Sequence, residues 1–170
     1  MSANEPQQFE QIVLPHLDAA YNLARWLAGN DHDAEDIAQE ACVRAFRFLG
    51  GYRGGDARAW LLTIVRNTAF TWLKKNRPQK VVSISDDELQ EIEDQTGVVG
   101  AFHGADKDVL RAALEALPLE FREALVLREL EGLSYKEIAE IAEVPVGTVM
   151  SRLARARRQL QDSITWKGAV

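Results

Sequence analysis

Apolar residues recur three and four positions apart over most of this chain, which is the spacing of one face of an α-helix. The pattern predicts amphipathic helices over residues 9–27, 34–49, 57–75, 109–117, 120–130, 135–142 and 146–160. Pro15 and Pro118 are expected to start or kink a helix. No segment alternates apolar and polar residues in the way that is typical of a strand. The sequence therefore predicts an all-α fold.

The helical pattern stops between residues 79 and 105, where acidic residues and glycines replace the regular apolar positions. A segment of this composition cannot bury enough apolar surface to offset the entropy of folding. We expect a flexible acidic linker there, with room for a short helix over 86–92. The chain then divides into two small helical domains, 1–78 and 106–170.

The segment from Ser134 to Leu160 has the pattern of a helix-turn-helix. Ser134 and Glu137 can form a capping box, which predicts a helix that begins at residue 135. Pro145 suits the first turn of the next helix, so the connection is the short turn at 143–144. Glycine often occupies such a turn, and a left-handed Glu143 would cost about 1 kcal/mol.

The second helix of this pair separates apolar from polar positions. Its buried face is predicted to contain Val149, Leu153, Ala156 and Leu160. The opposite face carries hydroxyl groups near the helix start and arginines behind them, namely Thr148, Ser151, Arg155 and Arg158, with Arg152 beside them. Such a helix suits the DNA major groove, where these groups contact base edges and phosphates. The alternative is an ordinary helical hairpin with a solvated basic face.

The net charge of -6 does not fit a DNA-binding protein until it is mapped along the chain. Residues 1–43 contain one basic and eight acidic residues, whereas residues 44–80 contain nine basic residues and one acidic residue. The second of these stretches would attract phosphate groups.

The predicted helix 57–75 has one face with Leu61, Ile64, Val65, Thr68 and Trp72, and an opposite face with Thr63, Arg66, Asn67, Phe70 and Lys74. A polar, basic face with an exposed aromatic ring suits contacts to an opened DNA strand. The preceding loop at 50–56 adds Tyr52 and Arg53 on flexible backbone. The alternative is that Phe70 and Trp72 both belong to the core.

The predicted helix 34–49 buries one face and exposes Asp36, Gln39, Glu40 and Arg47. The buried face contains Ala38, Ala41, Cys42, Ala45 and Leu49, so the single cysteine is expected to be a small core residue. Acidic residues at the helix start and basic ones at its end also complement the helix dipole. The charge pattern alone therefore does not establish a partner surface.

The segments DAEDIAQEACVRAFRF and ARAWLLTIVRNTAFTWLKK resemble the two central helices of domain two of bacterial RNA polymerase sigma factors. The segment ALPLEFREALVLRELEGLSYKEIAEIAEVPVGTVMSRLARARRQL resembles domain four of the same family. The resemblance covers about residues 8–78 and 108–162. With an acidic linker between the two parts, the chain is similar to the extracytoplasmic-function (ECF) group.

The resemblance implies a non-catalytic subunit that binds the clamp helices and flap of core RNA polymerase and directs it to promoters. Residues 1–78 would bind polymerase through Asp36, Gln39 and Glu40. They would bind the minus-ten element and the melted strand through Tyr52, Arg53, Arg58, Trp60, Arg66, Asn67 and Lys74. Residues 106–170 would bind the duplex minus-thirty-five element through Thr148, Ser151, Arg152 and Arg155. The group also implies an anti-sigma partner.

Two alternatives remain at this point. A dimeric helix-turn-helix regulator would bind promoter DNA without polymerase. A metal-dependent enzyme is suggested by the acidic segment 30–36, but this segment lacks the spacing of a calcium loop and is explained by helix capping. We therefore expect no catalytic residue, metal or cofactor. The chain has no apolar run of about 20 residues and no signal-peptide pattern, so we expect a cytoplasmic location.

Overall fold

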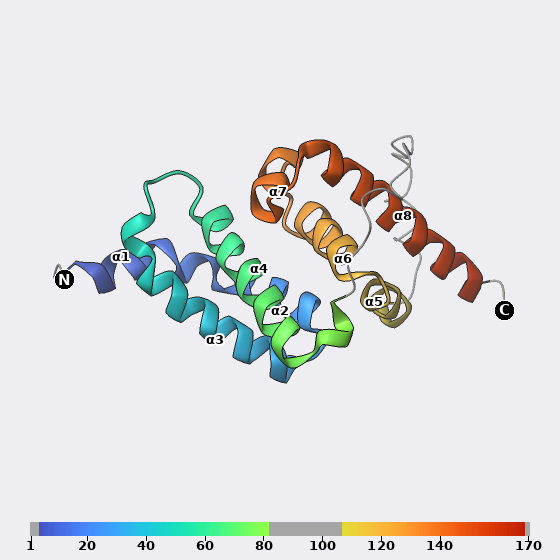
Figure 1. Cartoon of the computed structure of the whole chain (residues 1–170), viewed down its shortest axis with the longest axis horizontal. Coiled ribbons are helices and arrows are strands. Elements are labelled where there is room, and N and C mark those ends of the chain that lie inside the picture. Colours follow the sequence, from blue (N-terminus) through green and yellow to red (C-terminus); the bar gives the residue numbers. More distant parts are fainter. Residues whose placement is uncertain (1–3, 82–106, 169–170) are drawn as a thin grey trace. The chain divides into compact units, whose positions relative to one another are not determined.

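The computed structural model describes residues 4–81 and 107–168, and side chains as far as residue 164. The chain divides into two compact units, Met1–Val81 and Val82–Val170, which are described separately below. All regular elements within the described ranges are helical (Figure 1), so the expected all-α fold is confirmed. Most of the expected linker, residues 82–105, and its short helix over 86–92 lie outside the described residues. Among the described helices, none is long and apolar enough to cross a membrane.

The first unit is a bundle in which three helices pack against one another (Figure 1). Its helices are α1 (Glu5–Ile12), α2 (Leu17–Ala28), α3 (Asp31–Arg47) and α4 (Ala57–Asn76). The core between α2, α3 and α4 contains the fully buried side chains of Leu23, Leu27, Ile37, Leu61 and Leu73.

Pro15 divides the helix that the sequence predicts over 9–27. It lies in the 3-10 turn Leu14–His16, between α1 and α2. Proline has no backbone N–H and clashes with the preceding turn, so a continuous α-helix cannot pass through this position. The expected kink is therefore a break between two helices.

The α2–α3 turn is closed by local capping. Gly29 ends α2 with a φ of 86°, in the left-handed region that glycine adopts without strain. The Asn30 side chain accepts a hydrogen bond of 2.9 Å from the backbone N–H of Asp33 and so caps α3. This cap places the start of α3 at Asp31, three residues before the predicted start.

The 3-10 turn Pro78–Lys80 follows α4 and packs against it. Lys80 Nζ donates a hydrogen bond of 3.0 Å to the carbonyl oxygen of Ala28, at the end of α2. Lys80, which the sequence pattern assigns to the linker, therefore packs against the first unit and belongs to its fold.

The second unit is built around a long helix (Figure 1). Its elements are α5 (Lys107–Glu115), α6 (Leu119–Leu125), the π-helical turn Val126–Leu130, α7 (Tyr135–Ala142) and α8 (Val146–Gly168). Helices α5, α6 and α7 each pack on α8. Fully buried side chains from several of these elements form the core, among them Phe121, Leu127, Leu133, Ile138, Ile141 and Leu153.

Arg122 joins α5 to α6. Its guanidinium donates hydrogen bonds to the carbonyl oxygens of Leu114, Glu115 and Leu117, at 3.1, 2.8 and 3.0 Å. Leu114 and Glu115 are the last two residues of α5, and Leu117 follows it, so the arginine caps the end of that helix from a neighbouring one. Burial lowers the pKa of the Arg122 side chain, against a raising effect of the nearby Glu115 charge.

The capping box that begins α7 is present as predicted. The Glu137 backbone N–H donates to Ser134 Oγ at 3.1 Å, and the Ser134 N–H donates to Glu137 Oε1 at 3.0 Å. Glu143 ends the helix with a φ of 58° and a ψ of 47°. It is the only non-glycine residue with positive φ in the part of the chain that the structure describes. The left-handed turn expected from the sequence is therefore formed by glutamate.

Candidate nucleic-acid interface

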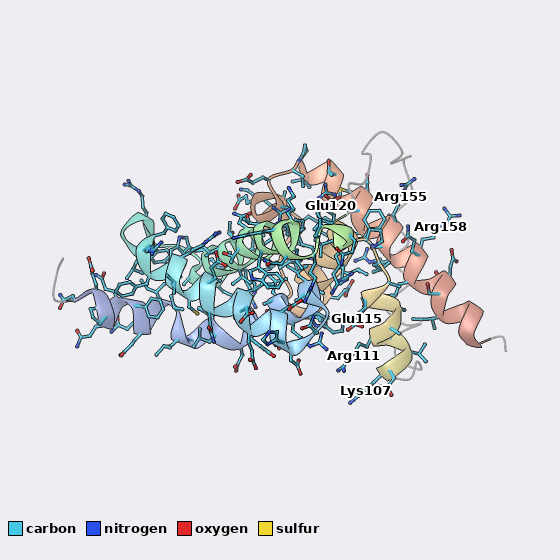
Figure 2. All side chains as sticks on the ribbon, turned by 60° about the horizontal axis from the view of Figure 1, so that its bottom comes forward. Lys107, Arg111, Glu115, Glu120, Arg155 and Arg158 are labelled. Carbon is cyan, nitrogen blue, oxygen red and sulfur yellow. The ribbon has the colours of Figure 1, made fainter. Side chains whose placement is uncertain are left out.

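Helix α8 carries the polar surface that the sequence assigns to duplex DNA. Val149, Leu153, Ala156 and Leu160 are buried on its inner face, as the periodicity predicts. On the other side Thr148, Ser151 and Arg155 are partly exposed and Arg158 is exposed. Figure 2 shows Arg155 and Arg158 projecting from the same side of α8. Four of the five predicted side chains of this surface therefore reach solvent.

Arg152 lies elsewhere than the sequence predicts. Its side chain is buried, with 7% of the residue exposed, and its Nη2 atom lies 3.9 Å from Oε2 of Glu120 in α6. Helix α8 packs against both α6 and α7, so its buried arc is wider than the apolar residues alone indicate. The geometry assigns Arg152 to the packing of α8 on α6, and we do not retain it as a DNA contact.

Arg157 is a second arginine of α8 that faces inward. It is buried, and its Nη2 donates a hydrogen bond of 2.9 Å to Glu129 Oε1 in the π-helical turn. Burial lowers the pKa of Arg157, but the hydrogen bonds and charges of Glu129 and Tyr135 outweigh burial and raise it overall. Some arginines of α8 are therefore buried against neighbouring helices and others are exposed to solvent. A count of basic residues does not distinguish the two groups.

The loop before α4 is folded back onto that helix. Tyr52 Oη donates a hydrogen bond of 2.7 Å to the Gly55 carbonyl oxygen, and the Tyr52 ring lies 5.2 Å from the Trp60 ring between centroids. Gly54 and Gly55 have φ values of 87° and 93°, which side-chain-bearing residues rarely adopt. The loop thus presents two partly exposed aromatic rings side by side, with Arg53 exposed next to them.

Helix α4 carries the other residues that the sequence assigns to the minus-ten element. The helix begins at the Asp56 side chain, which accepts a hydrogen bond of 3.1 Å from the Ala59 N–H. Along its length Arg58, Trp60, Arg66 and Asn67 are partly exposed and Lys74 is exposed. Arg66 donates to Asn67 Oδ1 at 3.2 Å. The predicted minus-ten residues therefore lie on one loop and the helix that follows it.

Phe70 is not the exposed aromatic residue that the helical pattern predicts. Only 9% of it is exposed, and the Arg66 guanidinium covers its ring at 3.9 Å from the centroid. Ile64 and Trp72, expected in the core, are partly exposed instead. Helix α4 packs against both α2 and α3, so its buried arc turns toward Phe70. Tyr52 and Trp60 are partly exposed and lie side by side, so they can offer rings for stacking.

The outer face of α3 exposes Asp36, Gln39 and Glu40, as expected. Val43 and Phe46 on the same helix are also exposed, Val43 by 51%, and the sequence interpretation missed both. Val43 follows Gln39 by four residues and Glu40 by three, and Phe46 follows Gln39 by seven, so helical spacing alone could have placed them on this face. The face is therefore acidic at one end, and at the other end it carries Val43 and Phe46 together with Arg47, which is exposed as expected.

The inner face of α3 is shifted slightly from the prediction. Ile37, Ala41 and Ala45 are buried, whereas Ala38 and Cys42 are only partly buried. Burial still raises the pKa of the Cys42 thiol. Within the described residues, His, Cys, Asp and Glu side chains form no group that could hold a metal ion.

Comparison with known proteins places both units in one family. A model of Sigma-70 region 2 matches residues 12–79, and a model of Sigma-70, region 4 matches residues 107–160. The match to region 2 contains α2, α3 and α4, and the match to region 4 contains α5 to α7 and most of α8.

Individual relatives agree. The ECF RNA polymerase sigma factor SigE of Mycolicibacterium smegmatis is 38% identical over 158 residues, which are 91% of this chain. The chain spans 60% of that protein's length. The RNA polymerase sigma-H factor of Pseudomonas aeruginosa is 34% identical over 172 residues, covering 94% of this chain and 88% of the relative. A solved structure of the sigma factor RpoE of Bartonella quintana, in complex with the anti-sigma factor NepR, has a TM-score of 0.72 and 29% identity. That match covers 92% of this chain and 96% of the other.

The two regions, in this order on one chain, define an RNA polymerase sigma factor. The chain belongs to the sigma-70 family and, within it, to the ECF group.

Proposed function

We propose that three surfaces divide the work of this sigma factor. The outer face of α3 binds core RNA polymerase, the surface of α4 and its preceding loop binds the minus-ten element, and α8 binds the minus-thirty-five element. We assign the first two tasks to residues 1–78 and the third to residues 106–170, with residues 79–105 as an acidic linker. The observation that carries this proposal is that each of the two sigma regions exposes a separate polar and basic helix.

The α3 face suits a protein partner better than DNA. The carboxylates of Asp36 and Glu40 would repel phosphate groups, and Val43 adds exposed apolar surface on the same side. A mixture of apolar residues with polar groups around them is typical of a protein interface. The clamp helices of polymerase are the partner that the sigma family indicates.

The α4 surface suits a melted strand. Tyr52 and Trp60 offer rings on which unpaired bases can stack, each worth about 1–3 kcal/mol. Basic and polar groups on the same loop and helix would contact the backbone of the strand, and they are Arg53, Arg58, Arg66, Asn67 and Lys74.

The α8 surface suits a duplex. Thr148 and Ser151 lie near the helix start, where side chains reach base edges in the major groove, and Arg155 and Arg158 follow where the phosphates would pass. The Ser151 hydroxyl donates to the Gly147 carbonyl oxygen at 3.0 Å, which leaves its oxygen able to accept a bond from a base.

The remaining parts of the proposal follow from the group. The chain acts in the cytoplasm as a non-catalytic subunit, and an anti-sigma factor holds it inactive until a signal releases it. The structural relative from Bartonella quintana is bound to such a protein.

The alternative of a dimeric regulator predicts different binding behaviour. A regulator of that kind binds promoter DNA without polymerase, whereas the proposed sigma factor needs core polymerase to hold both domains on the promoter. Fluorescence anisotropy of a labelled promoter duplex, titrated with the protein alone and with the holoenzyme, separates the two. Tight, specific binding by the protein alone would contradict the proposal.

A further inference from the structure

Met150 is an exposed apolar side chain on the helix that we assign to duplex DNA. It lies in the second turn of α8, with 46% of the residue exposed, and Val146 one turn earlier is 41% exposed. Single apolar residues are common on protein surfaces, so exposure alone does not indicate a partner. The position of Met150 carries the argument.

Met150 lies at the edge of the polar surface of α8. Successive residues of an α-helix are about 100° apart around its axis, so Gly147 falls between Met150 and Ser151. Gly147 is exposed and Ser151 is partly exposed. Met150, Gly147 and Ser151 therefore form one continuous arc, which Arg155 extends into the next turn.

Gly147 gives this arc an unusual shape. A Cβ atom added at Gly147 would meet nothing within 4 Å, and the φ angle of Gly147 is not positive. Neither packing nor backbone conformation within the described second unit therefore requires glycine, although glycine is less stable than alanine in a helix. A missing side chain between Met150 and Ser151 allows a partner to approach the helix backbone closely.

We propose that Met150 contacts the 5-methyl group of a thymine in the major groove of the minus-thirty-five element, where Gly147 permits the close approach. Thymine is the base that presents a methyl group in this groove, and apolar side chains are the ones that contact it. Cytosine has only a hydrogen at C5, and its 4-amino group is a donor that a thioether chain would cover without giving it a good acceptor. This proposal rests on the proposed role of α8, and it makes Met150 a residue that determines specificity.

The experiment begins with the holoenzyme and a duplex library in which the minus-thirty-five region is randomised. The selected element is then synthesised with each thymine replaced singly by deoxyuridine, which lacks only the methyl group. At one position, this change should weaken wild-type binding by about fourfold, as expected for one buried methyl group. Holoenzyme with Met150→Ala should not distinguish thymine from deoxyuridine at that position.

Three results would overturn the proposal. The selected element has no thymine in either strand, deoxyuridine has no effect at any position, or Met150→Ala keeps the full preference for thymine. Leu130→Ala is the matched control, because Leu130 is an exposed apolar residue outside α8 and its removal should leave the preference unchanged.

Arg155→Ala, measured in the same assay, distinguishes the role of Met150 from the assignment of α8 to duplex DNA, on which it rests. If Arg155→Ala weakens binding while no thymine depends on Met150, only the role of Met150 fails. If Arg155→Ala has no effect on binding, the assignment of α8 to DNA fails.

Discussion

Arg77 Nε, just after α4, donates a hydrogen bond of 3.2 Å to Oδ2 of Asp33 in the first turn of α3. Asp33 is buried, and the Asn30 side chain donates to the same oxygen at 3.0 Å. The pair joins positions 44 residues apart and fixes the end of α4, the helix assigned to the minus-ten element, against the start of α3, the helix assigned to polymerase. A count of charges would assign Arg77 to the basic, DNA-attracting stretch, but its side chain pairs with Asp33 within the fold.

Asp33→Asn should destabilise the first unit by about 1–3 kcal/mol, because it removes a charged acceptor from two hydrogen bonds in a buried site. Urea unfolding of the full chain at pH 7, followed by tryptophan fluorescence, measures this. Asp31→Asn is the control: Asp31 lies in the same turn and pairs with Arg25, but its side chain is exposed. It should change the free energy of unfolding by less than about 0.5 kcal/mol.

The Asp33 pair also predicts a pH dependence. Burial raises the pKa of Asp33, but hydrogen bonds from Asn30 and Arg77 and the charges of Arg77 and Lys80 outweigh burial and lower it. A carboxyl group with a lowered folded-state pKa contributes stability above its unfolded pKa of about 3.9 and loses it as the pH falls through the folded value. The difference between wild type and Asp33→Asn should therefore shrink below about pH 4. An undiminished difference in acid would contradict this account.

Arg152 and Arg155 should differ although both lie on α8. Arg152→Ala should destabilise the second unit by about 1–3 kcal/mol, because it removes a buried side chain and the positive charge that lies 3.9 Å from the Glu120 carboxylate. Arg155→Ala should leave stability nearly unchanged and weaken promoter binding by the holoenzyme about tenfold. Thermal unfolding and anisotropy titrations measure the two effects. If Arg152→Ala weakened promoter binding and left stability unchanged, Arg152 would have to be assigned to the DNA-binding surface again.

The sequence predicts helix positions well and the exposure of single side chains less well. The capping box at Ser134 and the prolines are local signals, so α7 begins where expected and the helix over 9–27 breaks at Pro15. The sequence interpretation misplaced Phe70 and Arg152 because each lies on a helix that packs against more than one other helix. Helical periodicity gives the centre of a buried face, but the width of that face depends on how many helices cover it.

Asp36→Arg should weaken the affinity for core polymerase by at least tenfold, because it reverses a charge on the proposed interface. The variant should keep its stability, since Asp36 is exposed. Affinity for core is measured with fluorescently labelled protein. Arg158→Ala is the control, because it changes the charge of an exposed residue in the second unit and should leave core affinity unchanged. Equal affinity of Asp36→Arg and wild type would remove Asp36 from the interface.

Gly147→Ala should separate stability from DNA binding. Alanine fits the open space and is favoured over glycine in a helix, so the second unit should gain about 0.5–1 kcal/mol. The added methyl group should nevertheless weaken promoter binding, because it lies where the DNA approaches the backbone of α8. A variant that is both more stable and equally tight in binding would show that DNA does not approach this position.

Promoter-dependent transcription tests the central claim most directly. Purified core polymerase is incubated with a library of promoter fragments, with and without this protein, and the RNA 5′ ends are sequenced. We predict new initiation sites that share two elements at a fixed spacing, and that depend on the Tyr52 and Trp60 region for one element and on Arg155 for the other. No added promoter-specific initiation would contradict the account.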